Sequence, residues 1–89
     1  MAAVPSSQFT VHLRPQDNVA VVTRPIAAGT QLDHQGATLS IASRVGLGHK
    51  LAVRPIKKGD AVYKYGQIIG FASRPIAPGE SVHRFSLCG

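Results

Sequence analysis

The sequence has no tryptophan, one methionine and one cysteine among its 89 residues. The lone Cys88 cannot form a disulfide within the chain, and without a cysteine pair there is no zinc-finger spacing. No apolar run approaches the roughly 18 residues of a membrane span. Residues 1–7 lack the basic and apolar regions of a signal peptide, so we expect a cytoplasmic protein. These absences exclude a disulfide scaffold and a zinc finger.

Acidic residues are also scarce, with four Asp and Glu against ten Lys and Arg, a net charge of +6 and an isoelectric point near 10.3. Such a balance suggests nucleic acid, anionic lipid or a small anion as partner. The basic residues are scattered, however, and the only adjacent pair is Lys57-Lys58. The five aromatic residues form no base-stacking motif. We therefore consider nucleic-acid binding a weak interpretation, and so few carboxylates give little support to acid–base catalysis by a carboxylate pair.

An internal repeat organises the chain. Three segments align without gaps, each beginning Arg-Pro-Ile with a Gly three residues after the Ile: residues 24–32, 54–62 and 74–82. Residues 43–51 keep only the spacing of aliphatic residue, Gly and aliphatic residue. Pro78 presets φ near about −65° and Gly79 supplies a positive φ, as a type II turn requires. We predict a strand, a tight turn and a second strand around each of Gly29, Gly48, Gly59 and Gly79.

The segments between these turns are short and β-like. The predicted strands are residues 9–13, 18–23, 51–53, 61–65, 67–73 and 81–85. Only residues 33–43 leave room for a short helix. The second pair of turn glycines follows the first after 30 and 31 residues, which indicates two related halves.

We therefore predict a mostly β fold with pseudo-twofold symmetry. In the second half, Gly66 and Gly70 should mark bulges or close backbone approaches. A chain of this length forms one domain. We place that domain at residues 9–86, between a flexible N-terminus of residues 1–8 and a C-terminal tail of residues 87–89.

Residues that could carry chemistry are few. The four His match no metal-ligand spacing, so we predict no metal site built by this chain alone. We expect His12 to face solvent from its strand and His34 to lie in a polar loop. Asp17 and Asn18 precede a strand, where ordinary turn chemistry is expected of them. From the residues alone, the chain is a basic β module that could offer a few His and Lys to an anionic ligand.

Three motifs carry a resemblance to a known family: Gly-His-Lys at residues 48–50, Lys-Tyr-Gly-Gln at 64–67 and Ile-Ala-Pro-Gly-Glu-Ser-Val-His at 76–83. With Asp-Asn-Val-Ala-Val at residues 17–21, they resemble the SAF domain of the altronate/galactarate dehydratase family over about residues 10–84. The resemblance implies a SAF-type β-clip, a long bent β-hairpin folded on itself. It also implies that the chain is the small subunit, or an excised N-terminal domain, of a hydro-lyase.

Such hydro-lyases remove water from an aldonate, an aldarate or a related 2-hydroxy acid such as sulfolactate. The resemblance implies a divalent metal, iron or manganese, in a large catalytic subunit or domain, and a chain that is inactive alone. Carried over position by position, the substrate-facing residues are His49, Lys50, Lys64, Tyr65 and His83. The family often continues Val-His-x-His-Asn, whereas Phe85 and Ser86 stand at the last two positions here.

Two other functions remain open. The chain could be a SAF ligand-binding or assembly module outside the dehydratases, as in sialic acid synthase or in pilus and flagellar assembly. It could also be a basic module for nucleic acid or polysaccharide. A neighbouring gene for a large dehydratase subunit would favour the dehydratase, and a secretion signal in a longer precursor would favour the assembly module.

Overall fold

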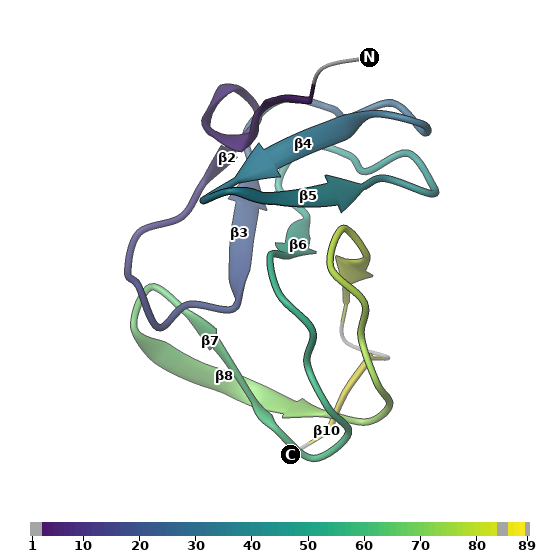
Figure 1. Cartoon of the computed structure of the whole chain (residues 1–89). Coiled ribbons are helices and arrows are strands. Elements are labelled where there is room, and N and C mark those ends of the chain that lie inside the picture. The colour runs from purple at the N-terminus through teal and green to yellow at the C-terminus, as the bar shows by residue number, and fades with distance from the viewer. Residues whose placement is uncertain (1–2, 84–85, 89) are drawn as a thin grey trace.

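The computed structural model describes residues 3–83 and 86–88. Its elements in chain order are β1 (Val4–Pro5), the 3₁₀ turn η1 (Ser6–Gln8), β2 (Thr10–Val11), β3 (Val19–Val22), β4 (Gln31–His34), β5 (Ala37–Ser40), β6 (Lys50–Ala52), β7 (Ala61–Lys64), β8 (Gln67–Ala72), β9 (Ser81–Val82) and β10 (Leu87–Cys88). They build three small sheets, ordered β1-β4-β5, β10-β8-β7 and β2-β3-β6-β9. The predicted mostly β fold is confirmed (Figure 1), and it is consistent with a SAF β-clip. Among the described residues, no helix has the length and apolar character needed to cross a membrane.

The four predicted turns are present. Their glycines, at positions 29, 48, 59 and 79, have φ between +82° and +89°. After each glycine, the next N–H donates to the carbonyl three residues earlier at 3.0 to 3.2 Å, which closes the turns 27–30, 46–49, 57–60 and 77–80. Only glycine adopts this φ without steric cost, so the spacing of glycines predicted the turns correctly.

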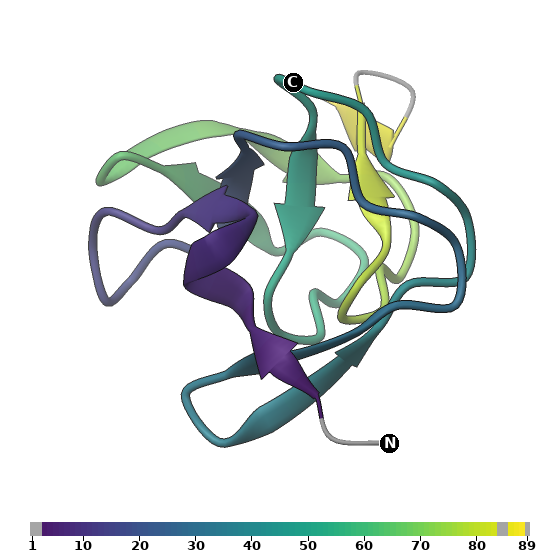
Figure 2. The same ribbon diagram turned by 90° about the horizontal axis from the view of Figure 1, so that it is seen from above.

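Two isolated β-bridges confirm that the halves are related. Ile26 pairs with Val45 and Ile56 with Ile76, each pair antiparallel. The first bridge closes the base of the β4–β5 hairpin, and the second closes the base of the β7–β8 hairpin. Figure 1 shows the two hairpins at the top and the bottom of the molecule, with β3 and β6 between them. The same view turned by 90° is given in Figure 2.

Both hairpins end in two-residue tips. Gln35 (φ 55°) and Gly36 (φ 85°) form the first tip, and Tyr65 (φ 56°) and Gly66 (φ 77°) form the second. Positive φ at both central residues is the signature of a type I′ hairpin turn. The short helix considered for residues 33–43 is therefore wrong, because positive φ at two consecutive residues interrupts a right-handed helix.

Two hydrophobic cores lie on either side of the β3–β6 pair. The first contains Ala20, Val22, Ile26, Leu32, Leu39, Ile41, Val45, Leu51 and Val53, with Phe9 packed against it. The second contains Val19, Ala52, Ile56, Val62, Ala72, Ile76 and Val82, with Ile69 and Leu87 packed against it. Successive residues of a strand point to opposite faces. The β3–β6 pair therefore serves both cores.

The folded domain extends beyond the predicted residues 9–86 at both ends. Residues 4–8, expected to be flexible, form β1 and η1, and β1 pairs in parallel with β4. Residues 87–88, expected to be a tail, form β10, which pairs with β8. Each end adds a third strand to one hairpin. The sequence did not predict these strands, because each is only two residues long and has one large apolar residue, Val4 or Leu87.

Of the two glycines singled out in the second half, Gly70 behaves as predicted and Gly66 does not. The β7–β8 register shifts between Val62 and Tyr63, which is a β-bulge. A Cβ on Gly70 would lie 3.3 Å from the Cβ of Leu87, so β10 approaches closely there. A Cβ on Gly66 would lie 3.5 Å from the Arg14 side chain, an ordinary contact distance. Gly66 instead supplies a positive φ at the hairpin tip.

Candidate functional site

Two of the predicted site residues lie together at the tip of the β7–β8 hairpin. Lys64 is the last residue of β7, and the exposed Tyr65 begins the tip. The Lys64 Nζ lies 5.4 Å from the centre of the Tyr65 ring, within the range of a cation–π contact. An ammonium and a phenol that are this close can bind one carboxylate together, the first by charge and the second by donating a hydrogen bond.

The backbone of this tip is held by Asp17, which is only 1% exposed. Its Oδ2 accepts a hydrogen bond from the Tyr65 N–H at 2.8 Å, and its Oδ1 accepts one from the Gly66 N–H at 2.8 Å. The Arg14 N–H donates a longer bond of 3.3 Å to Oδ2. Hydrogen bonds to a carboxylate are stronger than those between neutral groups. They fix Tyr65 in a backbone conformation that residues other than glycine seldom adopt.

Asn18 holds the same hairpin along β7, on the residues that precede the tip. Its Oδ1 accepts a bond from the Tyr63 N–H at 2.7 Å, and its Nδ2 donates to the Ala61 carbonyl at 2.9 Å. The turn chemistry expected of Asp17 and Asn18 is thus a minor part of their role, because their side chains reach across the fold to residues 61–66. Their place in the segment 17–21 shared with the family was the only sequence signal for this role.

His49, Lys50 and His83 form a second group. Lys50 pairs with Val82 across β6 and β9, so the antiparallel register brings His49 and His83 opposite each other just beyond the paired strands. Both histidines are exposed, and Lys50 is half-buried. The β7–β8 tip lies on the left in Figures 1 and 2, whereas the yellow-green β9 lies on the right. The five residues therefore form two groups, and their contact with substrate stays a prediction.

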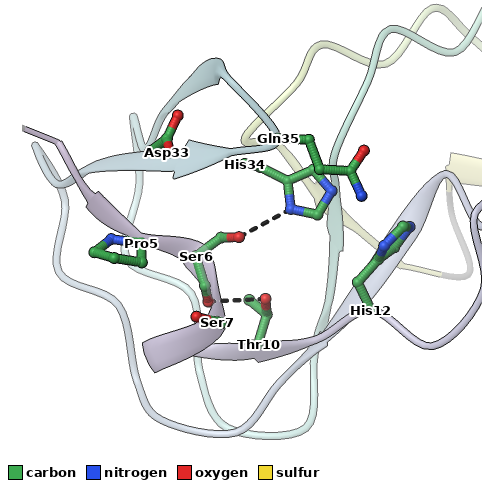
Figure 3. A pocket seen from close by; sticks show the side chains of 8 residues that line it. All are labelled: Pro5, Ser6, Ser7, Thr10, His12, Asp33, His34 and Gln35. Carbon is green, nitrogen blue, oxygen red and sulfur yellow. Dashed lines mark hydrogen bonds between the residues drawn. The ribbon is translucent and has the colours of Figure 1, made fainter.

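Sequence reasoning missed a third place, a pocket of about 300 Å³ beside η1 and β4 (Figure 3). His12 and His34 both line it, with ring centres 4.8 Å apart and ring planes at 87°. His34 belongs to β4 and is only 8% exposed, so the polar loop predicted for it is wrong. Its Nδ1 lies 2.9 Å from the Ser6 Oγ. His12 is half-buried instead of facing solvent.

A backbone carbonyl connects this pocket to the hairpin tip. The Asp17 carbonyl accepts a bond from His12 Nε2 at 2.7 Å and one from an Arg54 guanidinium N–H at 2.6 Å. A carbonyl can only accept, so Nε2 of His12 carries its proton. Asp17 thus contacts the histidine pocket through its main chain and the β7–β8 tip through its side chain.

The electrostatics of the pocket and of the tip differ. Burial lowers the pKa of His34, the positive charges of His12 and Arg54 lower it further, and Asp33 opposes them. The pocket is lined by hydroxyls, two imidazoles, an amide and the Asp33 carboxylate, without Lys or Arg. It suits a neutral hydrogen-bonding group, whereas Lys64 and Tyr65 suit a carboxylate.

A metal site needs several ligating side chains gathered in one place. Across residues 3–83 and 86–88, no three His, Cys, Asp or Glu side chains gather in a way that could hold a metal ion. His12 and His34 lie together with edge-to-face rings, but they are a pair without a third such ligand in the part of the chain that the structure describes. The described residues therefore offer no site for iron or manganese, which the resemblance places in the larger partner, and we assign no chemical step to a metal held by this chain.

The two positions that depart from the family pattern differ in what can be said of them. Phe85 lies outside the described residues. Ser86 is fully buried. Its carbonyl accepts from the Ser73 N–H at 2.8 Å, and its N–H donates to the His83 carbonyl at 2.8 Å. Ser86 therefore anchors the segment between β9 and β10.

The three sheets, the four glycine turns and the two related halves define a SAF-type β-clip domain. The family described as altronate/galactarate dehydratase SAF domain matches residues 8–87, and the chain belongs to this family.

Known relatives fall into two kinds. The chain is 37% identical over 73 residues to an altronate dehydratase of Bacillus subtilis (strain 168) and 40% identical over 73 residues to one of Escherichia coli (strain K12). Each match covers 82% of this chain and 15% of the relative. The chain is also 33% identical over 84 residues to the (2R)-sulfolactate sulfo-lyase subunit alpha of Chromohalobacter salexigens, covering 88% of this chain and 89% of that subunit. The chain therefore spans about 15% of the length of the altronate dehydratases but most of the sulfo-lyase subunit.

Proposed function

We propose that the chain is the accessory domain or small subunit of a metal-dependent hydro-lyase that removes water from a sugar acid or related 2-hydroxy acid, such as altronate, galactarate or sulfolactate. Its family membership and its relatives support this proposal. The chain works with a larger catalytic domain or subunit, and we place the divalent metal, iron or manganese, in that partner.

The observation that carries the proposal is the cation–phenol pair at the β7–β8 tip. Removing the proton next to a carboxylate builds negative charge on that carboxylate in the transition state. A cation held by a fixed backbone stabilises such charge without having to reorganise. Asp17 supplies the fixed backbone, Lys64 the cation and Tyr65 the hydrogen-bond donor. His49, Lys50 and His83 add further hydrogen-bond donors at the β6–β9 edge.

The test uses the chain reconstituted with its catalytic partner. We expect Lys64→Ala, His49→Ala or His83→Ala to lower kcat/KM tenfold to a thousandfold, about 1.4 to 4 kcal/mol of transition-state stabilisation. Lys57→Ala is the matched control, because Lys57 is an exposed cation on a turn of the same half. Its kcat/KM should change little.

Two outcomes would contradict the proposal. One is dehydration of altronate, galactarate or sulfolactate by the chain alone with added iron or manganese. The other is an equal, small effect of all four substitutions together with tight binding of DNA. Binding to DNA that weakens with salt at a log–log slope of about −0.9 per phosphate contacted would instead indicate the basic module that the charge of +6 allows.

A further inference from the structure

The β7–β8 hairpin carries an apolar outer face. Residues opposite each other in an antiparallel pair share a face of the sheet. Tyr63 pairs with Ile68, and Phe71 pairs with both Ala61 and Cys88. We call these five residues the outer face of the second hairpin. Ile68 is 52% exposed and Phe71 43% exposed, and none of the five is charged.

The first hairpin has the opposite character at the corresponding positions. Its outer residues are Gln31, Asp33, Thr38 and Ser40, which pair as Gln31 with Ser40 and Asp33 with Thr38. All four are exposed and polar. They correspond to Ala61, Tyr63, Ile68 and Phe71 after an offset of 30 residues, or 31 beyond the bulge. Within one backbone frame, one outer face is therefore polar and the other apolar.

We infer that the outer face of the second hairpin is the surface on which the catalytic body of the dehydratase docks. By catalytic body we mean the larger domain or subunit, corresponding to the part of the altronate dehydratases that this chain does not match. The inference rests on the proposed function and adds to it the place of contact.

Three observations favour this occupant. The cores of protein interfaces are depleted in charge and enriched in aromatic residues, and this face has that composition in a chain of net charge +6. The matched altronate dehydratases carry most of their length outside the segment that this chain represents. The face is also continuous with the tip, because Tyr63 directly precedes Lys64 and Tyr65 in β7.

Docking at this face has a consequence for the site. It places the tip at the edge of the contact, where a ligand can touch the chain and the catalytic body together. The Asp17 and Asn18 bonds then hold both the contact face and the tip, since they reach Ala61, Tyr63 and Tyr65. Lys64 and Tyr65 thus lie at the boundary between the two parts.

The experiment measures capture of the catalytic body. The tagged chain is expressed in its source organism, and a captured dehydratase of this family is identified by mass spectrometry and purified for affinity measurements. We expect Ile68→Ser combined with Phe71→Ser to weaken its binding at least tenfold. Leu47→Ser is the matched control, because Leu47 is 66% exposed but lies on the 46–49 turn. Its affinity should stay within twofold of the original.

Folding of each variant is checked by circular dichroism and thermal unfolding, and the single variant Ile68→Lys replaces the double variant if the latter does not fold. Binding that survives both outer-face variants, or that Leu47→Ser weakens equally, overturns the inference but leaves the proposed function standing. A dimer of the chain that the same variants disperse, without contact to the catalytic body, assigns the face to a second copy and also overturns it. Failure of the unsubstituted chain to capture any dehydratase contradicts the small-subunit form of the proposed function and overturns the inference with it.

Discussion

The two halves of this domain share a backbone arrangement and differ in the side chains that it carries. Each has two glycine turns, an isolated bridge and a hairpin with a two-residue tip. His34 and Lys64, 30 residues apart, precede the two tips, yet His34 is buried in a pocket and Lys64 lies beside an exposed tyrosine. The same backbone arrangement therefore carries very different surfaces. Functional residues of this fold are expected at positions where the two halves have different side chains.

The largest difference between the halves should be the loss of stability when corresponding turn glycines are replaced by alanine. Gly48 and Gly79 both have positive φ, but a Cβ on Gly48 meets nothing within 4 Å, whereas one on Gly79 would overlap the Ser40 carbonyl oxygen. We expect Gly48→Ala to cost about 1 to 2 kcal/mol from φ alone. Gly79→Ala should cost about 4 kcal/mol, because the backbone must also move. Urea unfolding measures both, and equal losses would show that the Ser40 segment shifts easily.

A smaller difference is expected between two aspartates. Asp17→Ala leaves the N–H groups of Tyr65 and Gly66 without their carboxylate, which should cost about 3 kcal/mol. Asp33→Ala removes an exposed carboxylate from the outer face of the first hairpin and should change the free energy of unfolding by less than about 0.5 kcal/mol. Loss of the Tyr65 and Gly66 amide signals from their folded positions in NMR spectra would locate the effect of Asp17→Ala at the tip.

These contrasts show what the sequence could and could not predict. The turns were predicted correctly because a positive φ is a local steric requirement that glycine alone meets easily. The role of Asp17 was not predicted, because its partners lie 48 and 49 residues further along the chain. The contact of His12 with His34 likewise joins residues 22 positions apart, one just after β2 and the other at the end of β4. A single sequence shows where a residue's own backbone conformation requires glycine, but it does not show which residues far along the chain a side chain will contact.

The histidine pocket gives the smallest predicted effect, a dependence of stability on pH. The pKa of His34 is lowered by burial and by the charges of His12 and Arg54, so the folded chain resists protonation more than the unfolded chain does. The stabilisation is present above the ordinary histidine pKa of about 6.5 and is lost as pH falls below it. We expect His34→Gln to flatten this decline between about pH 7 and pH 5 in urea titrations.

Thr38→Ala is the control for that measurement, because Thr38 lies on the same hairpin, is exposed and carries no titratable group. It should keep the pH dependence of the unsubstituted chain. A decline that persists unchanged in His34→Gln would show that another group causes it.

The position of β3 and β6 between two cores also bears on how the chain folds. Neighbouring residues such as Val19 and Ala20, or Leu51 and Ala52, pack into different cores. Neither half can therefore separate from the other without exposing apolar side chains of these strands to water. The duplicated plan does not produce two independent folding units. We therefore expect a single cooperative unfolding transition for the whole domain.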